Sequence, residues 1–273
     1  MTLESGWKKH LKRISELGKN KLARWAELGN FNNVIQPQIG EISGKDHRIK
    51  GNWNREIFKN NNPVIIELGC GKGEYTIGLS KLLPDKNFIG IDIKGARMWR
   101  GAKTANEYKL NNTAFLRTRI EFISSFFAEN EVDEIWITFP DPHPGKKNSN
   151  KRLTCPWFLN TYRKFLKDRG IIHLKTDNTE LFDFTRRLVM ENGLEILFST
   201  TNMYSADTEE LKVSVGSFTK NPDPDYNDHI SESIISIKTH YEIKFLEKGM
   251  TINYLAFRLE KDKSVCYGWE KKE

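Results

Sequence analysis

The sequence predicts an α/β fold in which a doubly wound, parallel sheet carries helices on both faces. Two observations predict it. From residue 63 onward, short apolar runs typical of buried strands alternate with helical patterns of ten or more residues, and a glycine-rich turn follows the first of these runs. With 273 residues, 38% of them hydrophobic, the chain has enough apolar side chains for one main domain with an appendage.

The alternation defines the expected elements in order. Strands are expected at residues 64–68, 88–93, 114–118, 134–138, 170–175, 195–200 and 251–259. Helices are expected at residues 75–83, 96–110, 122–127, 157–167, 181–192 and 231–248. The first helix stops before Pro84, because proline disfavours helical backbone in the residue before it.

This organisation predicts three parts. A basic N-terminal extension covers residues 1–62, the main domain covers residues 63–260, and a tail covers residues 261–273. Within the extension, residues 29–62 are rich in Asn and Gly and show little periodicity, so we expect them to be irregular and to lie on the surface.

The net charge of +7 is concentrated in two short stretches. Residues 1–28 hold seven basic and three acidic residues, and the loop 143–152 holds four basic and no acidic residues. Such clusters favour a polyanionic partner. Apolar residues recur at helical spacing in the first stretch, which is therefore either an RNA-contacting arm or a helix packed on the domain with a solvated basic face.

Several classes of protein are excluded. No run of about 18 apolar residues exists, so we expect no transmembrane helix and no membrane partner. The N-terminus has no apolar signal region, and the three cysteines form no C-x-x-C pair. We therefore expect a protein of the reducing cytoplasm with no metal site and no disulfides. The sequence leaves a monomer and a homodimer equally open.

The glycine-rich turn suggests a nucleoside ligand without phosphate. Its glycines are Gly69, Gly71 and Gly73, whereas a dinucleotide fingerprint needs G-x-G-x-x-G and a P-loop needs Ser or Thr after Gly-Lys. Glu67 at the end of the preceding strand suits a cationic or hydroxyl-rich ligand better than a phosphate. An NAD oxidoreductase is accordingly disfavoured.

S-adenosylmethionine is a ligand of that kind, since it carries a sulfonium, an ammonium and a ribose. Asp92 ends the second strand, where a carboxylate can accept hydrogen bonds from ribose hydroxyls. Its alternative role is to cap the next helix.

The fourth strand ends in a stiff turn, Phe139-Pro140-Asp141-Pro142-His143-Pro144. Three prolines restrict the backbone and fix Asp141 beside the expected cofactor cleft. A basic cluster follows at once and is positioned to meet phosphate. Its members are Lys146, Lys147, Lys151 and Arg152.

The sequence contains four distinctive motifs. They are Glu67-Leu68-Gly69-Cys70-Gly71-Lys72-Gly73, Phe139-Pro140-Asp141-Pro142 running into Lys151-Arg152, Leu174-Lys175-Thr176-Asp177-Asn178, and Thr239-His240-Tyr241-Glu242. In this order, over about residues 50–260, the sequence resembles bacterial tRNA (guanine-N(7)-)-methyltransferases of the TrmB type. The resemblance implies the Rossmann-like sheet of class I methyltransferases and transfer of a methyl group from S-adenosylmethionine to N7 of a guanine in the variable loop of tRNA.

The resemblance also implies roles for individual residues. Glu67, Gly69, Gly71, Gly73, Asp92 and Asp141 would hold the cofactor, with Asp141 also the catalytic residue nearest the methyl transfer. Asp177 and the segment Thr239, His240, Tyr241 and Glu242 would contact the guanine, and the basic loop would hold tRNA. Which of its lysines contacts the substrate stays open, as does the adenine contact near residues 119–121.

Two other functions remain open at this stage. Asp141-Pro142-His143 partly matches the Asp-Pro-Pro-aromatic turn of methyltransferases that act on exocyclic amines. A noncatalytic RNA-binding module with a degenerate cofactor pocket would also carry the basic clusters.

Overall fold

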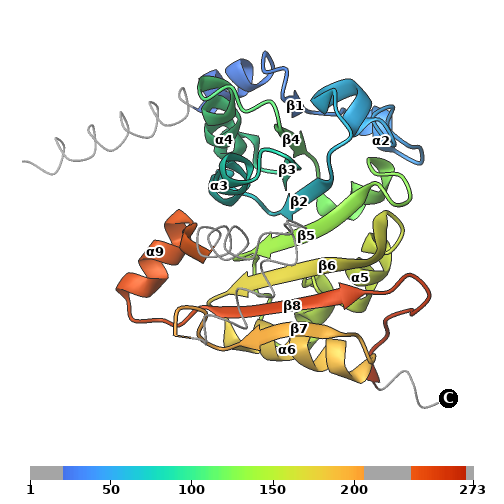
Figure 1. Ribbon diagram of the computed structural model, residues 1–273, viewed down its shortest axis with the longest axis vertical. Helices are drawn as coiled ribbons and strands as arrows, with labels where there is room; N and C mark the ends of the chain where they lie inside the picture. Colours follow the sequence, from blue (N-terminus) through green and yellow to red (C-terminus); the bar gives the residue numbers. More distant parts are fainter. Residues whose placement is uncertain (1–20, 206–234, 269–273) are drawn as a thin grey trace, which may run out of the picture.

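The computed structural model describes residues 21–205 and 235–268, and these contain one eight-stranded sheet in the order β1-β4-β3-β2-β5-β6-β8-β7 (Figure 1). The strands are β1 (Val34–Ile35), β2 (Val64–Leu68), β3 (Asn87–Asp92), β4 (Thr113–Arg117), β5 (Val132–Thr138), β6 (Leu166–Thr176), β7 (Ile196–Thr200) and β8 (Asn253–Leu259). Among these strands β8 alone runs in the opposite direction, so its pairs with β6 and β7 are antiparallel and all other pairs are parallel.

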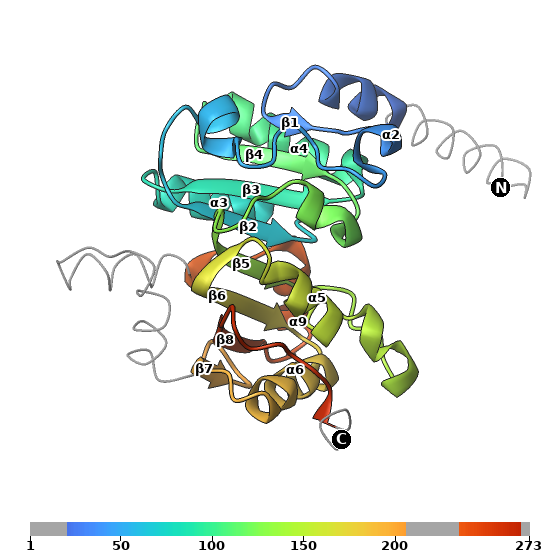
Figure 2. The ribbon, with the colours of Figure 1, turned by 90° about the vertical axis from the view of Figure 1, so that its right-hand side faces the viewer.

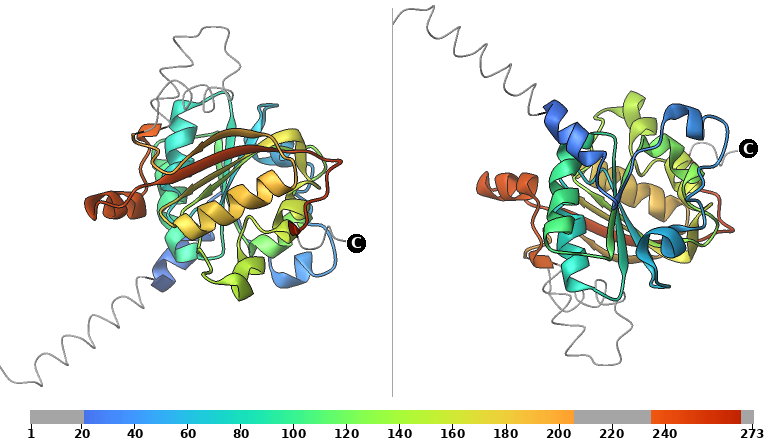
Figure 3. Two further views of the ribbon diagram at one scale, coloured as in Figure 1. Left: turned by 90° about the horizontal axis from the view of Figure 1, so that it is seen from below. Right: turned by 90° about the horizontal axis from the view of Figure 1, so that it is seen from above.

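Helices cover both faces of the sheet (Figures 2 and 3). On one face α3 (Glu74–Leu82) and α4 (Gly95–Glu107) pack through apolar side chains, while α5 (Pro156–Tyr162) and α6 (Thr179–Glu191) pack on the other. All five residues of β2 are buried, with Ile65 facing α3 and Ile66 facing the opposite layer. The predicted doubly wound fold is confirmed.

Two predicted helices end or begin elsewhere. The helix expected at 157–167 ends at Tyr162, because the chain turns through Lys164 and Phe165 and then enters β6. The helix expected at 231–248 is described only from residue 235. Its long section, α9 (His240–Glu247), begins after a non-helical break at residues 237–239.

The prediction that residues 29–62 are irregular and lie on the surface was wrong in part. They contribute β1, the short helix α2 (Ile39–Ile42) and a π-helical turn at Trp53–Phe58. Trp53 is fully buried, and its indole Nε1 donates a hydrogen bond to the Phe126 carbonyl at 2.9 Å. The aromatic side chains of this segment therefore complete the core under the sheet. From the other end of the chain, Val265 joins the same core.

The described part of the basic arm, residues 21–28, is helical and docks on α4. Leu28 is buried, and the Glu27 carboxylate accepts hydrogen bonds from Trp99 Nε1 at 2.7 Å and Lys103 Nζ at 2.9 Å. The helix formed by these residues therefore packs on the domain. Residues 1–20 of the predicted arm lie outside the described residues.

The carboxyl ends of β2 to β6 meet at one edge of the sheet, so the loops that follow them converge there. Because β8 is antiparallel, its first residue, Asn253, lies opposite Thr176 at the end of β6. The chain entering β8, which includes α9, therefore reaches the same edge. No helix within the described ranges is long and apolar enough to cross a bilayer.

Candidate active site

The converging loops line a cleft of about 680 Å³. Each of the five loops after β2 to β6 contributes residues, and α9 with its N-cap contributes Thr239, Tyr241 and Phe245. A cavity of this size accommodates a small-molecule ligand of nucleoside size with room for a second group. The cleft lies beyond the carboxyl ends of the parallel strands, which is where open α/β sheets bind their ligands.

In the glycine-rich turn, backbone atoms without side chains line the cleft. Gly69, Gly71 and Gly73 all have positive φ, at 75°, 57° and 71°. A Cβ at Gly69 would meet no atom within 4 Å, so open space lies above the backbone there. A Cβ at Gly73 would lie only 2.6 Å from the ring of Phe115, so this glycine is required by packing.

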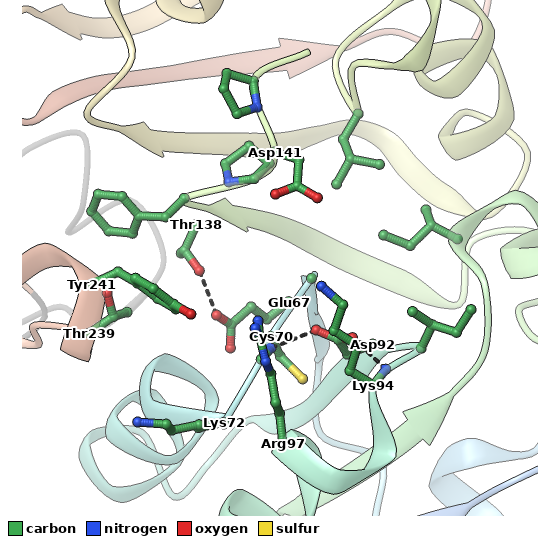
Figure 4. A pocket seen from close by; sticks show the side chains of 18 of the residues that line it. Glu67, Cys70, Lys72, Asp92, Lys94, Arg97, Thr138, Asp141, Thr239 and Tyr241 are labelled. Carbon is green, nitrogen blue, oxygen red and sulfur yellow. Dashed lines mark hydrogen bonds between the residues drawn. The ribbon is translucent and has the colours of Figure 1, made fainter. Parts of the chain in front are cut away.

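Glu67 lies at the floor of the cleft (Figure 4). It is buried, and it accepts hydrogen bonds from the Thr138 hydroxyl at 2.6 Å, from the Thr76 backbone N–H at 2.9 Å and from the Thr76 hydroxyl. Burial raises the pKa of Glu67 to about 7, although the hydrogen bonds from Thr138 and Thr76 act in the opposite direction. The carboxyl group thus ties β2 to β5 and to α3 directly under the ligand space.

Asp92 connects the glycine turn to the start of α4. Its Oδ2 accepts from the Gly71 N–H at 2.9 Å, and its Oδ1 accepts from the N–H of Lys94, the N-cap residue of α4, at 2.7 Å. Asp92 thus orders the approach to α4 without capping the helix, and each of its carboxylate oxygens has a further lone pair for a hydroxyl of a ligand. Asp92 lines the cleft.

The Phe139–Pro144 turn carries Asp141 on the opposite side of the cleft (Figure 4). Phe139 has a φ of 48°, which is unfavourable for a residue with a side chain and costs about 1–2 kcal/mol. Its N–H donates to the Lys175 carbonyl at 2.8 Å, and its ring packs against Phe245 at 5.8 Å between centroids. These contacts hold the turn so that the exposed Asp141 faces the ligand space.

The basic loop divides into exposed lysines and one buried arginine. Lys146, Lys147 and Lys151 are exposed, and Lys151 lines the cleft. Arg152 is 2% exposed; its guanidinium donates to the Pro142 and His143 carbonyls and pairs with Glu180 at 2.5 Å. The expectation that Arg152 meets tRNA phosphate is therefore corrected, because its donors are committed to holding the Pro-rich turn.

The Thr239–Glu242 motif forms the N-terminus of α9. Thr239 is the N-cap, its hydroxyl accepts from the Glu242 N–H, and Glu242 accepts from the Thr239 N–H, both at 3.2 Å. This reciprocal pattern is a capping box, a signal that Thr-x-x-Glu carries in the sequence. Thr239 and Tyr241 line the cleft, whereas the exposed His240 does not, although its backbone N–H donates to the carboxylate of Glu74, which does.

Glu242 is fully buried and does not line the cleft. Its carboxylate pairs with Lys175 Nζ at 2.9 Å and accepts a hydrogen bond from the Tyr204 hydroxyl. Burial lowers the pKa of Lys175, which is likewise fully buried, while Glu242 acts to raise it. The expectation that Glu242 contacts guanine is therefore corrected, because its oxygens already serve β6, Tyr204 and the α9 cap.

Asp177, two residues beyond Lys175, does line the cleft and is half-buried. Burial raises the pKa of its carboxyl group. The cleft also includes Lys94, Arg97, Thr138 and Phe158, which the sequence analysis did not single out. Their positions in the sequence could have indicated them. Thr138 is the last residue of β5, and Lys94 and Arg97 are the N-cap and a first-turn residue of α4, the helix that follows β3.

Known proteins share this architecture and this sequence. A family model described as a putative methyltransferase matches residues 61–255. The crystal structure of the 16S rRNA methyltransferase KamB superposes with a TM-score of 0.51 over 75% of this chain and 91% of its own, at 12% identity, which supports the fold alone. Fold and site together define an α/β methyltransferase of the Rossmann-like class.

Curated relatives narrow the class to one family. The tRNA (guanine-N(7)-)-methyltransferase of Bacteroides fragilis is 43% identical over 90% of this chain and 88% of its own length. The protein of the same name from Christiangramia forsetii is 46% identical over 89% of this chain and 99% of its own. The chain belongs to the tRNA (guanine-N(7)-)-methyltransferase family.

Proposed function

We propose that the protein transfers a methyl group from S-adenosylmethionine to N7 of a guanine in the variable loop of tRNA. One observation carries the proposal: the cleft has the open glycine turn and Asp92 on one side and Asp141 and Asp177 on the other. The sequence similarity to the tRNA (guanine-N(7)-)-methyltransferases described above supports the same activity.

The glycine side of the cleft fits S-adenosylmethionine. The space above Gly69 is open, and the carboxylate of Asp92 retains lone pairs for the ribose hydroxyls. Asp141 offers a negative charge from the facing loop, which suits a cationic ligand. When bound, S-adenosylmethionine supplies a methyl group activated on a sulfonium, and the by-product is S-adenosylhomocysteine.

The opposite side fits a purine. Asp141 and Asp177 present carboxylates, Tyr241 presents a ring that is 47% exposed, and Phe139 and Phe245 add apolar surface. Tyr241 is thus available to stack on a base, and it does not belong to the core. Asp177 can accept hydrogen bonds from the guanine ring N–H and amine, which adenine cannot reproduce.

Methylation at N7 requires no general base among these residues. Guanine N7 has an in-plane lone pair and no proton, so no side chain must remove a proton before attack. The positive charge moves to the purine during transfer, and the carboxylates of Asp141 and Asp177 favour that charge distribution. Their main task is to orient the base and to stabilise this charge. Lys151 lines the cleft and is exposed, so its ammonium is available for a tRNA phosphate.

The proposal is tested with labelled S-adenosylmethionine and three synthetic tRNAs of the same sequence. The first has guanosine in the variable loop, the second has 7-deazaguanosine at that position, and the third has adenosine. We expect label in the first tRNA only, because 7-deazaguanosine retains the amine of guanine but has no N7. Equal labelling of the 7-deaza tRNA would exclude N7 as the acceptor, and methyl on the amine of the digested nucleoside, identified by mass spectrometry, would then establish an exocyclic-amine methyltransferase. Salt-sensitive tRNA binding without any binding of S-adenosylmethionine would establish an RNA-binding module.

A further inference from the structure

A surface of cations and indole rings lies on helix 21–28 and the adjoining side of α4. We name it the Trp25 patch, and it consists of Lys21, Arg24, Trp25, Trp99, Lys103 and Arg117. Trp25 is 41% exposed, although it sits in a helix that docks on the domain. The patch carries four cations, of which Lys103 is paired with Glu27. A positively charged surface with an exposed large aromatic ring is thereby left facing solvent.

Cations are stacked on both indole rings of the patch. The Arg117 guanidinium carbon lies 4.6 Å from the Trp25 ring centroid, and Lys21 Nζ lies 5.6 Å from it. Arg24 and Lys103 lie over Trp99 at 4.8 and 5.0 Å. These contacts fix the orientation of Trp25 before any partner binds, which lowers the entropy lost on binding.

The patch is continuous with the cleft. Arg117 Nε donates a hydrogen bond to the Ile93 carbonyl at 3.3 Å, and Ile93 and Lys94 line the cleft. A Cβ on Gly95, the next residue, would lie 2.9 Å from Arg117 Cδ and 3.3 Å from Leu28. The buried Leu28 therefore seats the helix directly against the rim. The Trp25 patch therefore adjoins the cleft at the start of α4.

We propose that the Trp25 patch binds tRNA beside the methylated guanine, with an unpaired base against the exposed part of Trp25 and phosphates at Lys21 and Arg24. The proposal rests on the proposed function, which supplies tRNA as the partner. An aromatic ring among cations matches the two recognition elements of single-stranded RNA, base stacking and phosphate pairing. An acidic protein would need only the cations and would gain nothing from the continuity with the cleft.

The test measures the Kd and the KM of the full chain for tRNA. Trp25→Ala is expected to raise both about 5- to 150-fold, the range for loss of one stacked base. Trp25→Phe keeps an aromatic ring and is expected to restore most of the affinity. Lys21→Gln is expected to reduce the slope of log Kd against log salt concentration by about 0.7–0.9, one phosphate contact.

Tyr108→Ala is the matched control. Tyr108 follows the opposite end of α4, is 62% exposed and has Lys81 Nζ 3.6 Å from its ring centroid. This second exposed pair of a ring and a cation lies away from the cleft, so its loss should leave tRNA affinity unchanged. Binding of S-adenosylmethionine, measured by calorimetry, should be the same in both alanine variants as in the unmodified protein, and both variants should show one cooperative thermal transition.

The outcomes separate the two proposals. If the unmodified protein binds tRNA but methylates no guanine, the proposed function fails, while the Kd series still tests the patch. If the protein methylates tRNA and a folded Trp25→Ala variant keeps the Kd and KM of the unmodified protein, the patch proposal is overturned. An equal rise in Kd in the Tyr108→Ala variant would also overturn it, because the effect would then not be local to the patch.

Discussion

Removing the charge of Glu242 tests whether this residue anchors α9 or touches substrate. Glu242 and Lys175 are both fully buried with 2.9 Å between carboxylate and ammonium, so Glu242→Gln leaves a cation in the core without its counter-charge. Breaking a buried pair from one side costs about 3–5 kcal/mol. For a domain of this size the thermal midpoint should fall by roughly 6–20 °C.

The assay is urea unfolding of three variants beside the unmodified protein. Adding Lys175→Met to Glu242→Gln should recover much of the lost stability, because no unpaired charge then remains. Glu195→Gln is the control, since its ion pairs with Arg169 and Arg258 are both partly exposed and each should contribute only about 0–1 kcal/mol. The reasoning is refuted if Glu242→Gln unfolds within about 0.5 kcal/mol of the unmodified protein, or if adding Lys175→Met recovers none of the stability that Glu242→Gln loses.

Three further outcomes are expected. Asp141→Asn should keep the thermal midpoint and lower kcat about 10²- to 10³-fold; normal turnover in the labelled-methyl assay would remove Asp141 from the site. The folded-state pKa of Glu67 is raised from 4.5 to about 7, so its contribution to stability is fully present below pH 4.5 and falls by about 3 kcal/mol as the pH rises to 7. Glu67→Gln should remove this part of the pH dependence in urea unfolding, and an unchanged slope would contradict it. Gly73→Ala should lose about 2–5 kcal/mol of stability through positive φ and contact with Phe115, whereas Gly69→Ala, with open space, should lose only about 1–2 kcal/mol; equal losses would show that packing at Gly73 is unimportant.

The strand pattern and the edge where ligands bind could be predicted because both depend on local signals. Apolar runs mark β2, β3 and β5, and the turn after β2 carries glycines whose positive φ the structure requires. Asp92 and Asp141 follow strand ends, and parallel strands bring their ends together. The cleft therefore contains both residues as expected.

The direction of individual charged side chains could not be predicted from local sequence. Arg152 stands in a run of exposed lysines, yet it turns inward because Glu180 of α6 and two carbonyls of the Pro-rich turn lie within reach. Glu242 meets Lys175 from a strand 67 residues earlier. Only the capping box could have been seen locally, in the spacing of Thr239 and Glu242.

The reversed direction of β8 has a consequence for how such a protein can diversify. A strand parallel to its neighbours would start at the far edge of the sheet, and the chain before it would never approach the cleft. Running the other way, β8 begins at the edge of the sheet that carries the cleft, so α9 lies beside the cleft and is secured there by the Lys175–Glu242 pair. Substitutions in α9 would therefore reshape the side of the cleft that Thr239, Tyr241 and Phe245 line, while the glycine turn and Asp92 on the other half of the sheet would remain as they are.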